Sequence, residues 1–430
     1  MHPTRSFTLS CLALVALIAL SGQAFATTAY AQVGSCTPPN PPAHTFTTIQ
    51  AAVSAPTSLP GTVIEICPGN YPEQVVITRR LTLEGVVSGT EDAAVILPPT
   101  SGMVQNATDV DSGNPIAAQL LVQNTLASVI TIENLTVDGT GNQDPCTTDL
   151  MGILFQNASG LVNHVAVRNQ LPGDVLSGAQ CGESIYVQTA SGSTSKVTVE
   201  NSSVHNYNKN GITGNDAGTT LTLTENYIQG SGLSAIAAQN GIQLAYGATG
   251  SIISETVIDN IYSEPQNYVA TDILLFDTEE NSKIKINTNV LGNSQIPLGL
   301  YTDTPGTYGD GVTATGNHIF GTSVYDAIDV CTNGNTVTGN TIINSAESGV
   351  HLDASCTGTG NSNTATGNTF VESACAGILE DPGTTGNTTT SETYYTVPFT
   401  ITSSTASCNI PQSPQARGQA KTANKFSPKR

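Results

Sequence analysis

The sequence has 430 residues, no tryptophan, only three methionines and few charged residues, which make up 11% of the chain. Basic residues are the scarcest: 13 lysines and arginines stand against 33 aspartates and glutamates, a formal net charge of −20. Between Asn287 and Gln415 there is no lysine or arginine at all. Binding to nucleic acid needs a basic surface that neutralises phosphates, so we expect no nucleic-acid partner.

Long apolar runs are also missing after the first 20 residues. Arg5 precedes an apolar segment from Leu9 to Leu20, and either Ala24–Ala26 or Ala29–Ala31 offers a cleavage site. The segment is too short to span a bilayer and predicts a secretory signal peptide over residues 1–31, with a short membrane anchor as the weaker alternative. We therefore expect a secreted or periplasmic protein without a membrane span.

What the sequence does contain is a repeat between Met151 and Glu380. In each copy a small residue is followed by a β-branched residue or leucine, the anchor, and most copies have another apolar residue two positions later. The steps between anchors are 22 to 32 residues, and the nine anchors are Ile153, Ile185, Ile212, Ile242, Ile273, Leu300, Ile328, Val350 and Ile378. A period of this length, with strand-like alternation inside each copy, is typical of a β-solenoid.

A second repeated element is out of phase with the first and carries asparagine. Its later copies contain the pairs Gly316-Asn317, Gly339-Asn340 and Gly367-Asn368. Each coil therefore holds at least two strands joined by an asparagine-bearing bend. Asparagine tolerates left-handed backbone angles, and stacked asparagine side chains can hydrogen-bond along a ladder, so we interpret these residues as structural.

The two ends differ in composition from the repeats. Residues 32–45 form a proline-rich lead, and Thr47–Val53 then has a helix N-cap candidate and apolar residues at helical spacing. A solenoid leaves an open core and an unpaired edge at its end, which such a helix can cover. We predict one β-helix domain over residues 46–410 with an N-terminal helical cap, and a disordered basic tail over 411–430.

Eight cysteines remain once Cys11 leaves with the signal peptide, and an even number in an exported chain indicates disulfides. There is no CxxC motif or His/Cys cluster, so a zinc site is not expected. Eight cysteines permit 105 pairings, but neighbouring coils of a solenoid lie side by side, which favours pairing in sequence order. The predicted pairs are Cys36–Cys67, Cys146–Cys181, Cys331–Cys356 and Cys375–Cys408.

The repeats over roughly residues 46–400 resemble the right-handed parallel β-helix proteins of the pectin-lyase-like superfamily. The segment Phe46–Val53, followed by Ile64–Glu73 and Leu81–Gly85, is similar to the first coils of pectin methylesterases. The resemblance implies an all-β fold with three sheets, an apolar interior and ligands bound along an outer groove. We expect a single-domain right-handed parallel β-helix of about 10 to 12 coils.

The catalytic motifs of that superfamily are not matched. The chain lacks the Asp-Phe-Ile-Phe-Gly-like segment and groove tryptophan of methylesterases, and the Gly-His-Gly motif of polygalacturonases. The last coils lack the Arg or Lys that pectate lyases need beside a calcium cluster. His351-Leu352-Asp353 is only faintly similar to the Asp-Pro-His-Asp motif of uronan epimerases. None of these activities therefore carries over residue by residue.

Alternation within a strand defines two outward columns, one residue and three residues after each anchor. In the early coils these columns hold mainly leucine, glutamine, threonine, asparagine and alanine. The last four coils are instead predicted to gather acidic and aromatic residues with one histidine on a single face, with Asp329 and His351 as cross-strand neighbours. The predicted set is Tyr301, Asp303, Asp329, His351, Asp353 and Asp381.

Carboxylates roughly 5 to 10 Å apart are what glycoside hydrolysis uses, one as acid and one as base or nucleophile. A histidine beside a carboxylate can act as a general base near neutral pH. We therefore predict Asp329 and Asp353 as the acid and base of a catalytic site, assisted by His351.

The remaining members of the set are predicted to bind substrate: Tyr301 by stacking on a sugar ring, and Asp303 and Asp381 by hydrogen bonding. Three carboxylates at this spacing can also hold calcium, so Asp303, Asp353 and Asp381 are candidate calcium ligands. Calcium is the one cofactor we consider. The alternative for the whole set is a solvated polar face on an acidic protein.

Two functions remain open at this point. The first is a polysaccharide-active enzyme, for which the paired carboxylates favour a glycosidase over a lyase or esterase. The second is a non-catalytic surface or periplasmic β-helix protein that binds glycans or a protein partner. We expect a monomer in either case, and the fold alone does not choose between the two functions.

Overall fold

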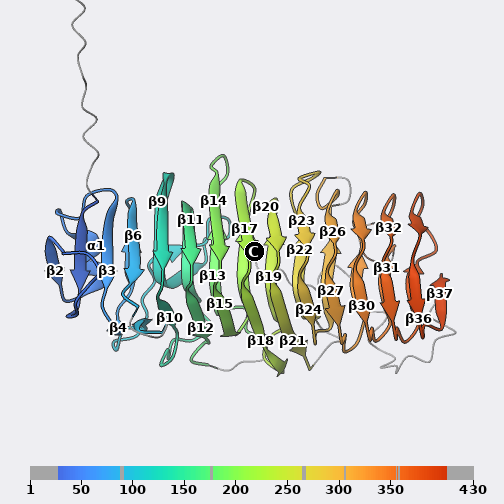
Figure 1. The fold of residues 1–430 in the computed structure, drawn as a ribbon, viewed down its shortest axis with the longest axis horizontal. Coiled ribbons are helices and arrows are strands. Elements are labelled where there is room, and N and C mark those ends of the chain that lie inside the picture. Colours follow the sequence, from blue (N-terminus) through green and yellow to red (C-terminus); the bar gives the residue numbers. More distant parts are fainter. Residues whose placement is uncertain are drawn as a thin grey trace, which may run out of the picture.

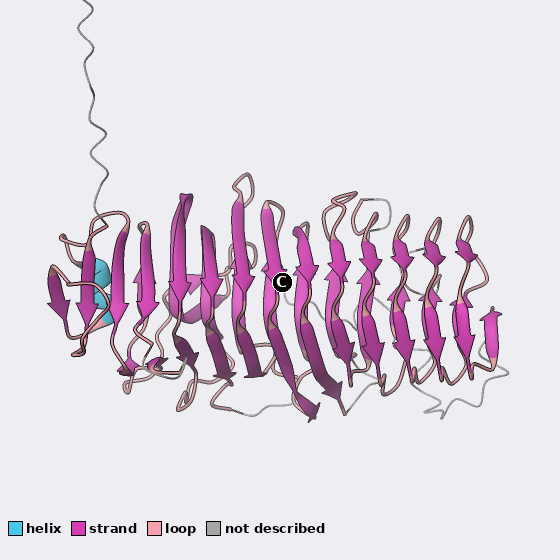
Figure 2. Ribbon diagram, viewed as in Figure 1, coloured by secondary structure: helices cyan, strands magenta, loops and turns pink. Residues whose placement is uncertain are grey.

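The chain is wound into a right-handed parallel β-helix whose coils follow one another along a single axis (Figure 1). The structure is a computed structural model and describes residues 28–87, 92–174, 178–263, 268–304, 307–354, 356 and 359–403. In nearly every coil the chain passes through three ladders of parallel strands, with loops at the corners (Figure 2). The predicted fold class is therefore confirmed.

The first ladder begins beside the helix and carries the repeat found in the sequence. Its strands are β5 (Val75–Ile77), the first parts of β9 (Pro115–Glu133) and β11 (Asp149–Asn163), β13 (Glu183–Gln188), β16 (Asn210–Asn215), β19 (Asn240–Ala245), β22 (Thr271–Phe276), β25 (Ile296–Tyr301), β28 (Ile328–Val330), β31 (Ser348–Leu352), β34 (Ala376–Glu380) and β37 (Phe399–Thr402). A short strand, β8 (Ala107–Thr108), lies antiparallel to β9.

The second ladder shares the long strands β9 and β11 with the first. Its other strands are β2 (His44–Phe46), β1 (Tyr30–Val33), β3 (Thr62–Ile66), β6 (Leu81–Gly85), β14 (Ser195–Glu200), β17 (Thr219–Thr224), β20 (Thr249–Ile253), β23 (Lys285–Asn287), β26 (Thr313–Thr315), β29 (Thr336–Thr338), β32 (Thr364–Thr366) and β35 (Thr388–Thr390).

The third ladder has 12 strands among the described residues, which agrees with the predicted number of coils. They are β4 (Gly69–Pro72), β7 (Ala94–Leu97), β10 (Thr136–Asp138), β12 (Ala166–Gln170), β15 (Ser203–Tyr207), β18 (Tyr227–Ser234), β21 (Thr256–Tyr262), β24 (Val290–Gly292), β27 (His318–Phe320), β30 (Thr341–Ile343), β33 (Thr369–Val371) and β36 (Thr393–Tyr395).

The core is a continuous column of aliphatic side chains inside the coils. Every second residue of a strand points inward, and in parallel strands in register these residues stack on their counterparts. In the first ladder Ile153, Ile185, Ile212 and Ile242 pair in this way and are fully buried. The interior is therefore apolar because each coil repeats the same inward positions.

The helix α1 (Ile49–Ser54) closes the N-terminal end, as predicted. Thr48 caps it by accepting a hydrogen bond from the Ala51 N–H, and Glu73 accepts two more from the N–H groups of Ile49 and Gln50. On its inner face Ile49 and Val53 are buried in the core. The helix thus covers apolar side chains that the first coil would otherwise expose.

The sheet starts earlier than the predicted domain boundary at residue 46. Strand β1 begins at Tyr30 and lies between β2 and β3, so two residues assigned to the signal peptide belong to a strand. The predicted lead over 32–45 contains the second half of β1 and the first two of the three residues of β2. The predicted tail over 411–430 lies outside the described residues.

Asparagine ladders run inside the corners, as the second repeat predicts. The side-chain oxygen of Asn317 accepts hydrogen bonds from the backbone and side-chain N–H groups of Asn289, and Asn340 and Asn368 continue the pattern at 2.8–3.0 Å. These side chains are almost completely buried. Each therefore satisfies backbone and amide groups of the neighbouring coil.

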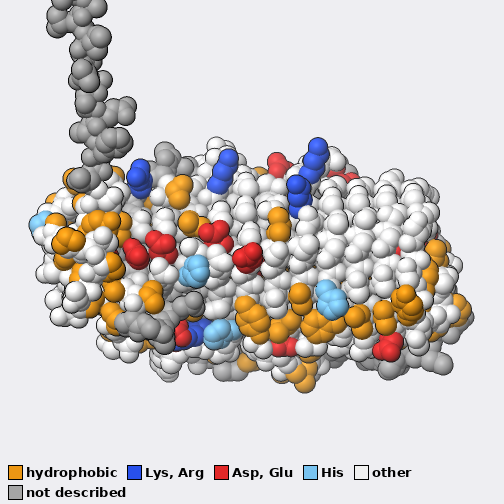
Figure 3. Space-filling model, in the orientation of Figure 1, with side chains coloured by type: hydrophobic (Ala, Val, Ile, Leu, Met, Phe, Trp, Pro, Cys, Tyr) orange, Lys and Arg blue, Asp and Glu red, His pale blue; other side chains and the backbone are white. Residues whose placement is uncertain are grey.

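The outer face over the last strands of the second ladder is lined by threonines. Thr313, Thr336, Thr364 and Thr388 pair in register, and so do the threonines two residues after each of them. In Figure 3 this part of the surface carries neither charged nor hydrophobic side chains. The face is polar but neutral, in contrast to the acidic first ladder.

Three of the four predicted disulfides are confirmed: Cys36–Cys67, Cys146–Cys181 and Cys331–Cys356. Cys375 is disulfide-bonded as well, but its predicted partner, Cys408, lies outside the described residues, so this pairing stays a prediction. Among the described residues there is no helix long and apolar enough to cross a membrane.

Candidate functional site

The first ladder brings most of the predicted residues together. Asp329 of β28 and His351 of β31 are paired in register, as predicted from the repeat. One coil earlier the predicted register is wrong by two residues: Leu298, and not Leu300, pairs with Ile273 and Ile328. Both leucines are buried in the core, so the apolar pattern fits either frame.

This shift moves Tyr301 and Asp303 to different places. Gly299 takes the position assigned to Tyr301, and Tyr301 instead pairs with Phe276. The Tyr301 ring lies so close to Gly299 that a Cβ atom there would clash with it. Its hydroxyl thereby reaches Asp329, whose backbone pairs with Gly299, and donates to Oδ2 at 3.0 Å. Asp303 falls beyond the strand and leaves the predicted set.

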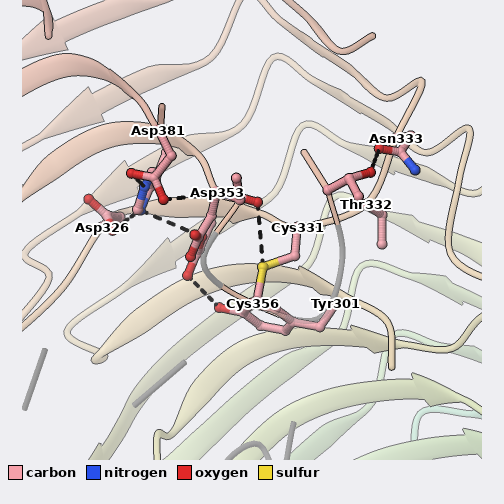
Figure 4. Close-up of a disulfide and its surroundings, with 12 residues drawn as sticks. Tyr301, Asp326, Cys331, Thr332, Asn333, Asp353, Cys356 and Asp381 are labelled. Atoms are coloured by element: carbon pink, nitrogen blue, oxygen red, sulfur yellow. Dashed lines mark hydrogen bonds and ion pairs between the residues drawn. A yellow bond between two sulfur atoms is a disulfide. The ribbon is translucent and has the colours of Figure 1, made fainter. Parts of the chain in front are cut away.

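We call the resulting group the Asp–His cluster; it comprises Tyr301, Asp326, Asp329, His351, Asp353 and Asp381. Figure 4 shows four of its side chains, those of Tyr301, Asp326, Asp353 and Asp381, beside Cys331 and Cys356, which form a disulfide. Nδ1 of His351 lies 3.0 Å from Oδ2 of Asp326 and 3.8 Å from Oδ1 of Asp329. Nε2 of the same ring lies 3.2 Å from Oδ1 of Asp381.

The contacts of His351 indicate its protonation state. An ionised carboxylate only accepts hydrogen bonds, so a ring nitrogen that faces one must carry a hydrogen. Both nitrogens of His351 face carboxylates, those of Asp326 and Asp381. With both nitrogens engaged, the ring links the two carboxyl groups and has no nitrogen left over to act as a general base.

Most of the Asp–His cluster is buried, contrary to the expectation of an open polar face. The exposed fractions are 1% for the His351 side chain and 3% for that of Asp329, and Asp353 is fully buried. Asp381 is more accessible, with 21% of its side chain exposed. Outward-facing residues of this ladder are covered by further packing, so pointing away from the core does not mean contact with solvent.

An apolar cluster on the outside of the first ladder provides part of that cover. Its members are Ala245, Val269, Leu274, Phe276, Ile296, Tyr301, Tyr325 and Cys331. Burial and the nearby carboxylate of Asp329 raise the pKa of Tyr301 well above its ordinary value, so its hydroxyl stays protonated. The ring of Tyr301 is buried in this cluster, so its predicted stacking on a sugar ring stays a prediction that the packing does not favour.

The predicted calcium ligands are not brought together, since Asp303 lies apart from Asp353 and Asp381. Among the described residues, the groups with ligand atoms within 4.8 Å of one another include Asp326, Asp329 and His351, and His351, Asp353 and Asp381. Calcium prefers ligand sets made of oxygen atoms, whereas both groups include an imidazole whose nitrogens already face carboxylates. The donor set therefore fits calcium poorly.

A second acidic region is open to solvent, and we call it the acidic groove. Its volume is about 450 Å³, and it lies at the corner where strands of the first ladder end. Its lining is formed by Asp111, Thr189, Ser191, Asp216, Ala217, Tyr246, Asp277, Asp303, Thr304 and Tyr308. The volume lies in the range of small-ligand sites, and the lining of carboxylates, hydroxyls and two aromatic rings is mostly polar.

Three groove residues occupy equivalent corners of consecutive coils. Asp216 follows β16, Tyr246 follows β19 and Asp277 follows β22, and the last residues of these strands pair in register. All three have left-handed backbones, with φ of 76°, 55° and 48°. The left-handed angle turns the chain at each of these corners, as it does at many other corners of this β-helix.

Asp277 has an unusual environment for a carboxyl group. Its Oδ1 accepts hydrogen bonds from the Thr302 hydroxyl at 2.6 Å and from the Asp303 N–H at 3.0 Å. Burial and, secondly, the neighbouring Asp303 carboxyl raise the pKa of Asp277 to about 6. A carboxyl that keeps its proton near pH 6 at the wall of a groove can donate it to a ligand.

Sequence reasoning missed Asp216, Asp277 and Asp326. Only the strand positions of the repeat were compared, whereas Asp216 and Asp277 stand directly after the strands. Aligning one further position beyond each strand would have revealed the corner column Asp216, Tyr246, Asp277. Asp326 precedes β28, and its contact with His351 depends on a loop path that the repeat does not describe.

No protein-family model and no curated protein matches the chain. Solved structures do match: the GH136 lacto-N-biosidase from Eubacterium ramulus superposes with a TM-score of 0.53 at 9% identity, over 86% of this chain and 68% of that one. The DFA-IIIase from Arthrobacter chlorophenolicus A6, in complex with DFA-III, superposes with a TM-score of 0.50 at 13% identity, over 80% and 87%. Likeness at these identities shows the shared β-helix fold.

Proposed function

We propose that this protein is an exported glycoside hydrolase that acts in the acidic groove, with Asp277 as general acid and Asp216 as general base. The observation that carries the proposal is the placement of these two carboxylates. They occupy equivalent corners two coils apart, on either side of Tyr246, in an open cavity of about 450 Å³.

The spacing suits an inverting reaction. Two ladder steps of 4.7–4.9 Å separate the two backbones by about 10 Å. Inverting glycosidases hold their carboxyl groups about 6.5–9.5 Å apart, which leaves room for a water molecule beside the sugar. The corner spacing of about 10 Å is close to the upper end of this range.

In the proposed reaction Asp277 gives its proton to the glycosidic oxygen as the bond from that oxygen to C1 breaks. Asp216 takes a proton from a water molecule, whose oxygen forms the new bond to C1 from the opposite face. The products are two shorter sugars, one with an inverted anomeric centre, and the two carboxyl groups then exchange protons with solvent. Tyr246 and Tyr308 supply aromatic surface for the sugar rings.

The test is hydrolysis of a panel of neutral and charged oligosaccharides, followed as new reducing ends. Replacing the acid, Asp277→Asn, is expected to lower kcat about 10²- to 10⁴-fold, and Asp216→Asn is expected to act similarly. Asp259→Asn, a carboxylate change on the third ladder, is the matched control and keeps full activity. Hydrolysis that survives both groove substitutions would refute the assignment.

The Asp–His cluster is a second candidate location for the same class of reaction. One carboxylate oxygen of Asp353 and one of Asp381 lie within 4.8 Å of each other. Retaining glycosidases place their carboxyl groups about 5–5.5 Å apart, so this pair favours retention. NMR of the first product separates the two locations: an inverted anomer supports the groove, and a retained anomer together with loss of activity in Asp381→Asn supports the cluster.

A non-catalytic glycan-binding protein is the alternative to both. The burial of Asp329, His351 and Asp353 favours it over catalysis at the cluster. The names of the two similar structures, a lacto-N-biosidase and a DFA-IIIase, agree with a glycan-directed role, although a shared fold does not transfer an activity. Glycan binding by calorimetry without any release of reducing ends would identify this alternative.

We further propose secretion or export to the periplasm, which the disulfides support, and a monomeric state.

A further inference from the structure

The acidic groove has a strongly one-sided charge. Four of its ten lining residues are aspartates, and none of the ten is a lysine or arginine. On the side of the groove formed by Asp303, Thr304 and Tyr308, the chain carries no lysine or arginine from Asn287 to Gln415. A cleft lined by charges of one sign concentrates ligands of the opposite sign and repels those of the same sign.

The four carboxylates divide into two kinds by exposure. Asp216 and Asp277 are almost completely buried at the wall of the groove. Asp111 and Asp303 are exposed, and the Oδ1 atom of Asp303 accepts a hydrogen bond from the Thr304 hydroxyl at 2.8 Å. The first pair is therefore suited to chemistry on a bound sugar, and the second pair can reach charged groups carried by that sugar.

We propose that the groove selects glycans built from amino sugars with free ammonium groups, and that Asp111 and Asp303 are its specificity-determining residues. This inference rests on the proposed function, because it assigns a substrate class to the same groove. An ammonium group forms an ion pair with a carboxylate, whereas an N-acetylated or unsubstituted sugar offers only neutral N–H and O–H donors.

The same charges weaken the binding of acidic polysaccharides, because the groove and the ligand are then both negative. A uronan has a carboxylate on every residue and would meet Asp111 and Asp303 with the same sign of charge. No basic residue lines the groove to pair with a uronan carboxylate. The charge of the groove thus predicts an order of affinity: amino sugars bind most tightly, neutral sugars less tightly and uronans most weakly.

The experiment compares three hexamers of equal length: β-1,4-linked glucosamine, its fully N-acetylated form, and galacturonate. Binding is measured by calorimetry with the inactive Asp277→Asn variant, and hydrolysis with the unaltered protein. Each exposed carboxylate–ammonium pair is worth about two- to fivefold in affinity, so two pairs predict about tenfold tighter binding of glucosamine than of N-acetylglucosamine. This preference shrinks to about twofold in 0.5 M salt, because the pairs are exposed to screening.

The double variant Asp111→Asn/Asp303→Asn is expected to lose the preference while still binding the N-acetylated hexamer. Because both positions are exposed, the variant should fold, which an unchanged melting temperature verifies. Equal binding of the two amino-sugar hexamers, or tighter binding of galacturonate, would overturn the inference and leave the groove as a glycan site. Absence of binding and hydrolysis with all three would overturn the proposed function together with it.

Discussion

The Nδ1 atom of His351 lies 3.0 Å from Oδ2 of Asp326, and both side chains are almost completely buried. On the other side of the ring, Nε2 faces Asp381 of the following coil. The ring of His351 therefore links three consecutive coils through its contacts with the carboxyl groups of Asp326 and Asp381. Charges buried in this way are stable only while each keeps its partner.

Replacing His351 by leucine should destabilise the last coils strongly. The substitution leaves the Asp326 carboxylate buried without its main partner, and breaking a buried ion pair costs about 3–5 kcal/mol. The measurement is the denaturation midpoint of the purified protein. The double variant Asp326→Leu/His351→Leu removes both charges and should recover part of the loss, because the energies of contacting residues are not additive. A leucine variant as stable as the unaltered protein would show that this link is unimportant.

The raised pKa of Asp277 predicts the pH dependence of hydrolysis. A general acid must be protonated, and the pKa of Asp277 is raised to about 6 by burial and the Asp303 carboxyl. Activity on a neutral oligosaccharide should therefore be lost as pH rises through about 6. Asp303→Asn removes the second cause of the raised pKa, so the loss of activity should occur at lower pH in this variant. If Asp303→Asn loses activity at the same pH as the unaltered protein, another group is the acid.

The interior of the fold could be predicted from the sequence, whereas the state of its outer face could not. Ile153, Ile185 and Ile212 recur because every coil buries an apolar side chain at the same inward position. This recurrence is the period seen in the sequence. The asparagine ladder and three disulfides follow from the same stacking. The exposure of outward residues such as Asp353 cannot be predicted in this way, because it depends on loops whose length varies from coil to coil.

The site was therefore predicted in part. The pairing of Asp329 with His351 follows from the register of two regular strands. Tyr301 and Asp303 were misplaced because Leu298 and Leu300 both fit the inward pattern. Asp216 and Asp277 were missed because corners do not show the alternation of strands, and their left-handed backbones are not encoded by glycine or asparagine.

The asparagine ladder makes a separate prediction about stability. The side chain of Asn340 accepts two hydrogen bonds from Asn317 and donates to Asn368 and to the Ala314 carbonyl. Asn340→Ala should cost at least about 2 kcal/mol, because it leaves several buried polar groups unpaired. Thr336→Ser, on the neutral outer face of the same coil, is the control and should change stability by less than about 0.5 kcal/mol. Equal denaturation midpoints for the two variants would contradict a structural role for the ladder.

The first strand predicts where the signal peptide is removed. Strand β1 begins at Tyr30, pairs with β3 and buries Ala31 in the core. Cleavage after Ala31 would remove two of its four residues, whereas cleavage after Ala26 leaves the strand whole. The mature protein should therefore begin at Thr27, which N-terminal sequencing and intact mass of the exported protein can determine. A chain that starts at Gln32 should melt at a lower temperature than one that starts at Thr27, because the edge of β3 loses half of its partner strand. A natural N-terminus at Gln32, or equal melting temperatures for the two chains, would contradict this account.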